Sequence, residues 1–193
     1  GLVLDMKSLA ELKDGDFVTS LTPLVDAYQS WIQTLEQSLV RPAENLLPFK
    51  TDAQQAIDIC QQNLKRIQAG IALLGDNKQA AEAFRFANRA MWLQRIHTLY
   101  TESVRREEGK SLEEIDTPEN RTWYPFQLAF ILLNLPGLTD PLHEERSHPT
   151  QAISDVLWYP TGGGKTEAYL GLTAYTLAMR RLQGKVGDFD GSA

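Results

Sequence analysis

The sequence predicts a mostly helical protein of mixed α and α/β class, in which an antiparallel helical bundle precedes the start of a phosphate-loop domain. Apolar residues recur at spacings of three and four over residues 23–40, 51–74 and 76–102, which is the period of helices with a buried face. A short apolar run at 155–159 then meets the glycine-rich stretch 160–167, and a helical pattern follows. Strand, glycine loop and helix in that order are typical of a nucleotide-binding domain.

Three long helices are expected in the first part of the chain, and each has end signals. Thr22 is expected to cap the first helix, with Pro23 as its first residue, because Pro is tolerated where the N–H needs no helical partner. The second helix starts with a capping-box pattern at Thr51 and stops at Gly75, and the third begins at Asp76. Their short connection predicts that the second and third helices are antiparallel neighbours.

A change of composition predicts a domain boundary. Between residues 101 and 121, charged side chains supply 11 of 21 positions, which indicates a solvated linker with at most one helical turn. We therefore expect a helical bundle domain at 1–105, a charged linker at 106–122 and the truncated first part of a nucleotide-binding domain at 123–193.

The second part is expected to open with a short buried helix at 123–135 and a loop at 136–150. The strand at 155–159 follows, and the last helix covers about 164–182 before Gly184 ends it.

Composition excludes several classes of protein. The 193 residues carry a net charge of −6, so the chain is not by itself a strongly basic nucleic-acid clamp. The single cysteine, Cys60, excludes an internal disulfide and a cysteine-based zinc site. The sequence has no apolar run of about 18 residues, so we expect no membrane contact and a cytoplasmic location. Both ends look cut, and we expect the chain to be an excerpt of a larger protein.

The glycine loop is the strongest functional signal. Gly162, Gly163 and Gly164 allow a tight turn whose N–H groups can cradle a phosphate, together with Thr161 before them. Lys165 would stabilise charge on the β- and γ-phosphates, and the Thr166 hydroxyl would bind Mg²⁺. ATP and Mg²⁺ are therefore the expected cofactors, with Lys165 and Thr166 as the catalytic residues.

Tyr159 departs from the general phosphate-loop pattern, which has glycine at that position. Two alternatives therefore stay open for this stretch. One is a glycine-rich turn followed by a chance lysine, and the other is a degenerate loop that no longer binds nucleotide.

The stretch Pro-Thr-Gly-Gly-Gly-Lys-Thr-Glu over 160–167 resembles motif I of superfamily-two helicases and translocases, including Glu167 after the threonine. Upstream, Tyr-Pro-Phe-Gln over 124–127 is similar to the aromatic and glutamine motif that these proteins use on adenine. The resemblance implies a RecA-like domain in which Gln127 reads the adenine edge and an aromatic residue such as Phe126 stacks on the base. It adds Phe126, Gln127 and Glu167 to the expected nucleotide-binding residues.

A narrower resemblance covers nearly the whole chain. The segments 83–91, 125–135 and 157–172 resemble the helicase subunits of bacterial DISARM anti-phage systems, the DrmA type. The resemblance implies ATP-driven work on phage DNA in a defence complex with a partner subunit. Contacts with DNA would then lie in parts of the protein outside this chain.

Two rival functions come from other classes. One is a phosphate-loop NTPase that is not a helicase, and the other is a non-catalytic helical interaction module with a vestigial loop. Among the remaining polar residues, Asn88 lies in the most apolar helix, and we favour a buried residue that orders helix packing over a contact with a partner. His143 and His148 are expected to be solvated, because no cysteine accompanies them.

The chain alone is predicted not to hydrolyse ATP. The acidic box that would hold Mg²⁺ and the attacking water does not occur after Lys165. A phosphate-release assay on the 193-residue chain is expected to show no turnover. Measurable turnover that disappears in Lys165→Ala would contradict this prediction.

Overall fold

The computed structural model describes residues 1–40, 43–158 and 162–190, and it is mostly helical, as predicted. Two short strands near the end of the chain form an antiparallel hairpin, with Lys185 opposite Asp190 and Val186 opposite Phe189. The elements, in order, are α1 (Met6–Ala10), α2 (Asp16–Val40), the 3₁₀ helix η1 (Glu44–Phe49), α3 (Lys50–Asp76), α4 (Lys78–Arg105), α5 (Leu112–Ile115), the 3₁₀ helix η2 (Pro118–Arg121), α6 (Pro125–Thr139), α7 (Glu144–Ser147), α8 (Lys165–Gln183), β1 (Lys185–Val186) and β2 (Phe189–Asp190).

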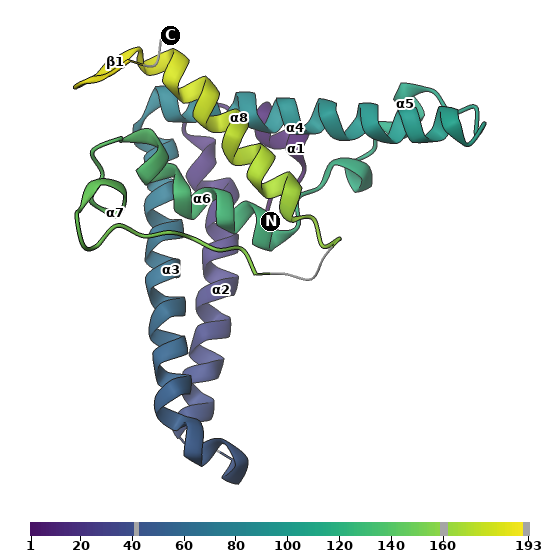
Figure 1. The fold of residues 1–193 in the computed structure, drawn as a ribbon. Helices are drawn as coiled ribbons and strands as arrows, with labels where there is room; N and C mark the ends of the chain where they lie inside the picture. The colour runs from purple at the N-terminus through teal and green to yellow at the C-terminus, as the bar shows by residue number, and fades with distance from the viewer. Residues whose placement is uncertain (41–42, 159–161, 191–193) are drawn as a thin grey trace.

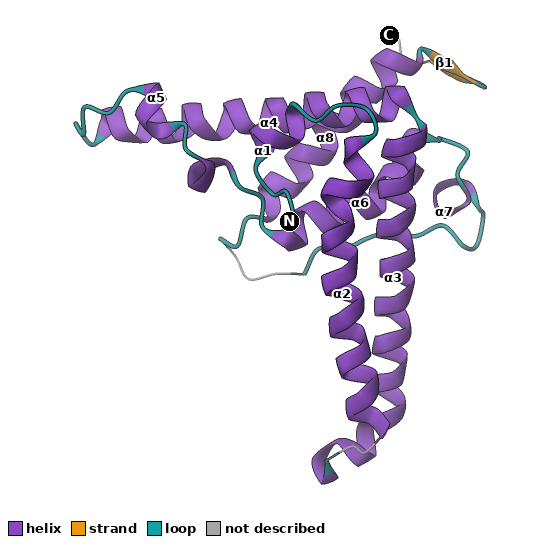
Figure 2. Ribbon diagram, turned by 180° about the vertical axis from the view of Figure 1, so that it is seen from behind, coloured by secondary structure: helices purple, strands orange, loops and turns teal. Residues whose placement is uncertain are grey.

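The helices form two arms that meet at a common body. Figure 1 shows α2 and α3 side by side as an antiparallel pair that projects from the body, while α4 crosses near the base of that pair. The reverse view shows the same arrangement (Figure 2). α6 packs against α3, and α8 packs against both α4 and α6. The elements that carry the glycine loop therefore rest directly on the helical bundle.

One apolar core runs through this body. It joins buried side chains from Met6 in α1 to Met179 in α8, and a smaller cluster around Ile32 and Ile57 holds the far part of the α2–α3 pair. Burial of apolar surface is the main favourable term in folding, so α6 and α8 are stabilised by the helices of the first part. Among the described helices, none has the length and apolar character needed to cross a membrane.

The first long helix begins earlier than predicted. α2 starts at Asp16, so Pro23 lies inside the helix and Thr22 is not its N-cap. The Thr22 hydroxyl instead donates to the Val18 carbonyl oxygen at 2.7 Å, within the preceding turn. The apolar period continues upstream of the proline, and this burial outweighs the helical hydrogen bond that Pro23 cannot donate. The buried residues on both sides are Phe17, Leu21, Leu24 and Val25.

The predicted third helix starts two residues late in the structure, and a single residue joins it to α3. Asn77 follows the last residue of α3 and caps α4, where its side-chain oxygen accepts from the Ala80 N–H at 3.0 Å. Gly75, the predicted stop, lies just inside α3. The predicted antiparallel pairing of the second and third helices is wrong. The single-residue connection at Asn77 makes α3 and α4 neighbours only at their junction, so α3 pairs with α2 and α4 crosses near the base of that pair (Figure 1).

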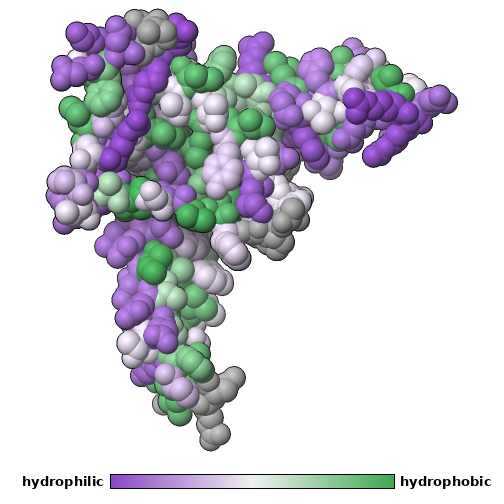
Figure 3. All heavy atoms as spheres, viewed as in Figure 1, coloured by the Kyte–Doolittle hydropathy of each residue, from purple (hydrophilic) through white to green (hydrophobic). Residues whose placement is uncertain are grey.

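Part of the segment predicted as a charged linker is packed instead of solvated. Arg121 is buried; its Nε donates to Asp5 Oδ2 at 2.7 Å and its Nη1 donates to Asp116. Asp116 also accepts from the Trp92 indole N–H at 2.8 Å. Burial alone would raise the pKa of Asp5, but hydrogen bonds from Ser8 and Arg121 lower its pKa below the ordinary value. The one predicted helical turn is present as α5, and Figure 3 shows hydrophilic residues gathered near it.

The prediction of a strand at 155–159 is wrong for the residues that the structure describes. Residues 155–158 form no strand, and Tyr159 lies outside the described residues. A strand is defined by hydrogen bonds to a neighbouring strand, and within the described part of the chain the only sheet is the β1–β2 hairpin. The start of a RecA-like domain therefore stays a prediction, whereas the helix after the loop is confirmed as α8.

The crossing of α3 and α6 is so close that it tolerates no side chain at Gly70. A Cβ there would lie 2.0 Å from the Leu132 backbone carbonyl oxygen. Gly70→Ala is expected to force the helices apart and to lower the free energy of unfolding by about 1–3 kcal/mol, the usual cost of overpacking.

Gly137→Ala in α6 is the matched control for that substitution. A Cβ at this position meets no atom within 4 Å, so the higher helix propensity of alanine is expected to leave stability unchanged or slightly raised. Urea unfolding of both variants measures the difference, and equal stabilities would contradict the close crossing.

Candidate nucleotide-binding site

The glycine loop enters α8 through a left-handed turn. Gly162 has φ +84° and Gly164 has φ +85°, and Gly164 is the N-cap residue of α8. Residues with a Cβ rarely adopt this conformation, so glycine is required at both positions. The first N–H groups of α8 are unpaired within the helix and carry its partial positive charge, which favours an anion at this place. Thr161, also predicted for the site, lies outside the described residues.

Gln127 connects the start of α6 to this loop. Its side chain is 3% exposed, and its Nε2 donates to the Gly164 carbonyl oxygen at 2.6 Å. Its Oε1 accepts from the Tyr124 N–H at 2.8 Å, which also caps the first turn of α6. A Cβ on Gly164 would lie 2.5 Å from Gln127 Nε2, so the loop is seated directly on the amide. Gln127 therefore holds the loop, a role that the sequence did not predict.

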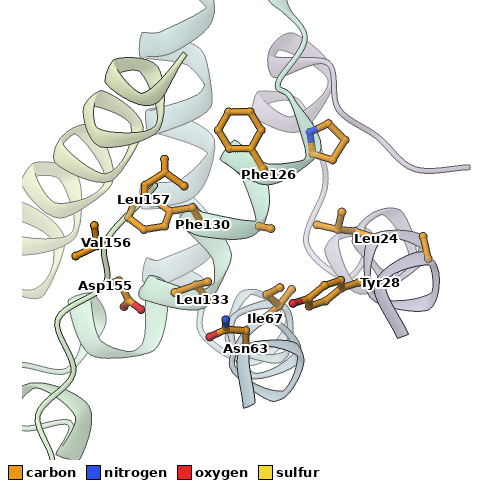
Figure 4. Close-up of a pocket in the computed structure, with 13 residues that line it drawn as sticks. Leu24, Tyr28, Asn63, Ile67, Phe126, Phe130, Leu133, Asp155, Val156 and Leu157 are labelled. Atoms are coloured by element: carbon orange, nitrogen blue, oxygen red, sulfur yellow. The ribbon is translucent and has the colours of Figure 1, made fainter. Parts of the chain in front are cut away.

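Gln127 and Phe126, the two residues predicted to contact adenine, line different cavities. Phe126 stacks on Tyr124 with ring centroids 5.9 Å apart, and it lines an apolar pocket of about 560 Å³ beside Leu24 and Leu157 (Figure 4). Tyr124 itself is 60% exposed and lies on the side of the loop, so it is the aromatic residue within reach of a base bound there. The amide of Gln127 keeps one N–H and one oxygen lone pair beyond the two bonds described, and its role on adenine stays a prediction.

A cavity of about 530 Å³ lies beside the loop, within the usual range for small-molecule sites. Its charged lining consists of Arg95, Glu119 and Glu167. One wall comes from the loop and the start of α6, and the other comes from α1, α4 and the segment around η2. The lining residues are Met6, Arg95, Pro118, Glu119, Asn120, Thr122, Tyr124, Gln127, Gly162, Gly164 and Glu167.

The chain is 41% identical over 180 residues to DISARM protein DrmA of Bacillus paralicheniformis (strain ATCC 9945a / NCIMB 11709 / CD-2). It resembles DISARM protein DrmA. The match covers 92% of this chain and 15% of that protein, so the chain spans a small part of the length of this relative. No family model matches the chain. The narrower resemblance inferred from three sequence segments is thereby confirmed.

Because the DrmA match covers 92% of the chain, it includes both the helical bundle and the segment with the loop.

The buried residue that joins these two parts is Trp123. Its indole Nε1 donates to Asn88 Oδ1 at 2.8 Å, and Asn88 Nδ2 donates to the Phe84 carbonyl oxygen at 2.9 Å. A Cβ on Gly171 of α8 would lie 3.1 Å from the Trp123 ring. The interpretation of Asn88 as a buried residue that orders helix packing is confirmed.

A second connection, Arg66 with Asp155, anchors the segment before the loop. Arg66 of α3 donates to both carboxylate oxygens of Asp155 at 2.7 Å and to Glu145 at 3.0 Å. The hydrogen bonds with Asp155 raise the pKa of Arg66 above its ordinary value. Bidentate pairs of this kind fix geometry as well as charge. The sequence did not predict this pair, because no local pattern relates residues this far apart.

His143 and His148 accept hydrogen bonds from backbone N–H groups in the turns where they lie. His143 Nδ1 accepts from the Glu145 N–H at 3.3 Å at the start of α7, and His148 Nδ1 accepts from the Gln151 N–H at 3.0 Å. Within the described residues, no group of three or more His, Cys, Asp or Glu side chains is placed to hold a metal. Thr166, the predicted Mg²⁺ ligand, is exposed in the first turn of α8, next to half-buried Lys165.

The contact between Gln127 and Gly164 can be isolated by comparing two glycines. Alanine at Gly162 or Gly164 meets the same left-handed strain, roughly 1–2 kcal/mol. Only at Gly164 must Gln127 also give way and lose its bonds to the loop, at a further cost of about 1–3 kcal/mol. Gly164→Ala is therefore expected to be the less stable variant in urea unfolding.

The same two alanine substitutions, at Gly162 and at Gly164, are then made in a Gln127→Ala background to complete a double-mutant cycle. The difference between the two glycine positions is expected to vanish there, because the amide is absent. If the difference in unfolding free energy between the two alanine variants kept its size in that background, the proposed hold of Gln127 on the loop would be contradicted.

Proposed function

We propose that this chain is the ATP-binding portion of a DNA helicase or translocase that acts in DISARM anti-phage defence. The observation that carries the proposal is the pair of left-handed glycines at the start of α8, bordering a cavity of about 530 Å³. The 41% identity to DISARM protein DrmA supports the link to defence. Hydrolysis of ATP is proposed for the full-length protein.

The chemistry of the described residues supports a nucleotide ligand, and for Mg²⁺ they offer the hydroxyl of Thr166. The loop N–H groups and the start of α8 would hold the phosphates, since oriented N–H groups and the helix end both favour negative charge. Lys165 would add a point charge and Thr166 a hydroxyl ligand for the metal. The missing Cβ atoms at Gly162 and Gly164 leave room for close approach of the phosphates to the backbone. Tyr124 would support the base by stacking.

The segment before the loop is proposed to become the first strand of a RecA-like sheet. Val156 is 77% exposed and Trp158 is 92% exposed, which is unusual for large apolar residues beside a core. Parallel sheets of nucleotide-binding domains are covered on both faces, so neighbouring strands would bury these side chains. The bidentate Arg66–Asp155 pair would hold this segment in position.

DNA is proposed to bind through parts of the protein outside this chain, because a net charge of −6 argues against a strongly basic nucleic-acid clamp within it. A partner subunit in a defence complex, and a location in the cytoplasm, are proposed from the resemblance to DrmA.

ATP binding by the full-length protein should depend on Lys165. Calorimetric titration with Mg²⁺–ATP is expected to show binding that weakens at least about tenfold in Lys165→Ala, because a charge-assisted contact with phosphate is lost. Lys78→Ala, at an exposed position in the first turn of α4, is the control and should bind as the unsubstituted protein does. Absence of binding to the unsubstituted protein would instead favour a helical interaction module with a vestigial loop.

A further inference from the structure

The cavity beside the glycine loop has a second wall built by the helical bundle. Arg95 of α4, Met6 of α1 and Glu119 of η2 line the same cavity as Gly162 and Gly164. Buried Trp123 fixes α4 against the loop side through its bond to Asn88, so this wall is held in place. A ligand seated on the loop would therefore share the cavity with Arg95 and Met6, which belong to the first part of the chain.

Arg95 is the cation of that wall, and it has no protein partner within the described residues. Its side chain is half-buried, yet it takes part in none of the hydrogen bonds or ion pairs that these residues form. Other arginines that are partly or fully buried differ, since Arg85 pairs with Asp14 at 2.8 Å and Arg121 pairs with Asp5 at 2.7 Å. Partly buried arginines are normally paired, which makes an unpaired one beside a cavity a candidate for ligand binding.

An anionic ligand in this cavity would need a cation beside it, because two of the three charged lining residues are acidic. Glu119 and Glu167 also line it and would repel phosphates, so loop N–H groups alone face an unfavourable field. The guanidinium of Arg95 offers a planar set of N–H donors that matches phosphate oxygens in pairs. It is therefore the described side chain in the cavity lining best suited to offset the two carboxylates.

We propose that Arg95 is a phosphate-binding residue of the nucleotide site, supplied by α4 of the helical bundle. This inference rests on the proposed function of the glycine loop and assigns a residue that the loop motif does not contain. Bound nucleotide would then bridge α8 and α4, so that the position of the helical bundle and the occupancy of the site become linked.

Calorimetric titration of the full-length protein with Mg²⁺–ATP tests the assignment. Arg95→Gln is expected to raise the dissociation constant about tenfold, the loss typical of one charge-assisted contact. Arg95→Lys retains the charge without the planar donors and is expected to recover part of the affinity. Arg89→Gln, an exposed position on the same helix and away from the cavity lining, is the matched control and is expected to leave binding unchanged.

The outcomes separate this inference from the function on which it rests. Binding that is lost in Lys165→Ala but unchanged in Arg95→Gln would overturn the role of Arg95 and leave the proposed function standing. Equal loss in Arg95→Gln and Arg95→Lys would also overturn a role based on charge. No binding to the unsubstituted protein would remove both proposals. Arg95→Met, which keeps the aliphatic stem, decides the question if Arg95→Gln does not fold, as thermal unfolding would show.

Discussion

The buried side chain of Trp123 joins the two parts of the molecule. Its backbone N–H donates to the Leu4 carbonyl oxygen at 2.9 Å, its indole N–H donates to Asn88 of α4, and its ring lies against Gly171 of α8. Removing any of these contacts would leave a buried polar group unpaired or a void in the core, both of which are costly. Four residues later, Gln127 is thereby placed where its amide can hold Gly164.

Rigid support of this kind matters for a phosphate site. Backbone N–H groups bind an anion well only when they already point at it, and a buried side chain such as Gln127 fixes their direction before the ligand arrives. The Arg66–Asp155 pair does the same for the segment before the loop. The glycine loop thus lies between two anchors, one on α6 and one on α3, and both depend on the packing of the helical bundle.

The sequence predicted the features that local chemistry determines. The apolar period and the end signals placed α3, α4 and α8 within a few residues, and the polar Asn88 in an apolar helix was interpreted correctly. The sequence does not reveal the start of α2, because Pro23 suits a first helical position although buried Phe17 and Leu21 extend the helix upstream. Contacts across the fold, such as Arg66 with Asp155 or Gln127 with Gly164, leave no local pattern, because each residue alone is ordinary in its own element.

Nucleotide is proposed to bind between the glycine loop and the wall formed by α4 and η2. A structure of the full-length protein with Mg²⁺ and a non-hydrolysable ATP analogue tests this proposal most directly. Phosphates are expected at Gly162 to Lys165, with the Arg95 guanidinium within hydrogen-bond distance of a phosphate oxygen. A nucleotide seated instead in the apolar pocket beside Phe126, with Arg95 facing only solvent, would contradict it.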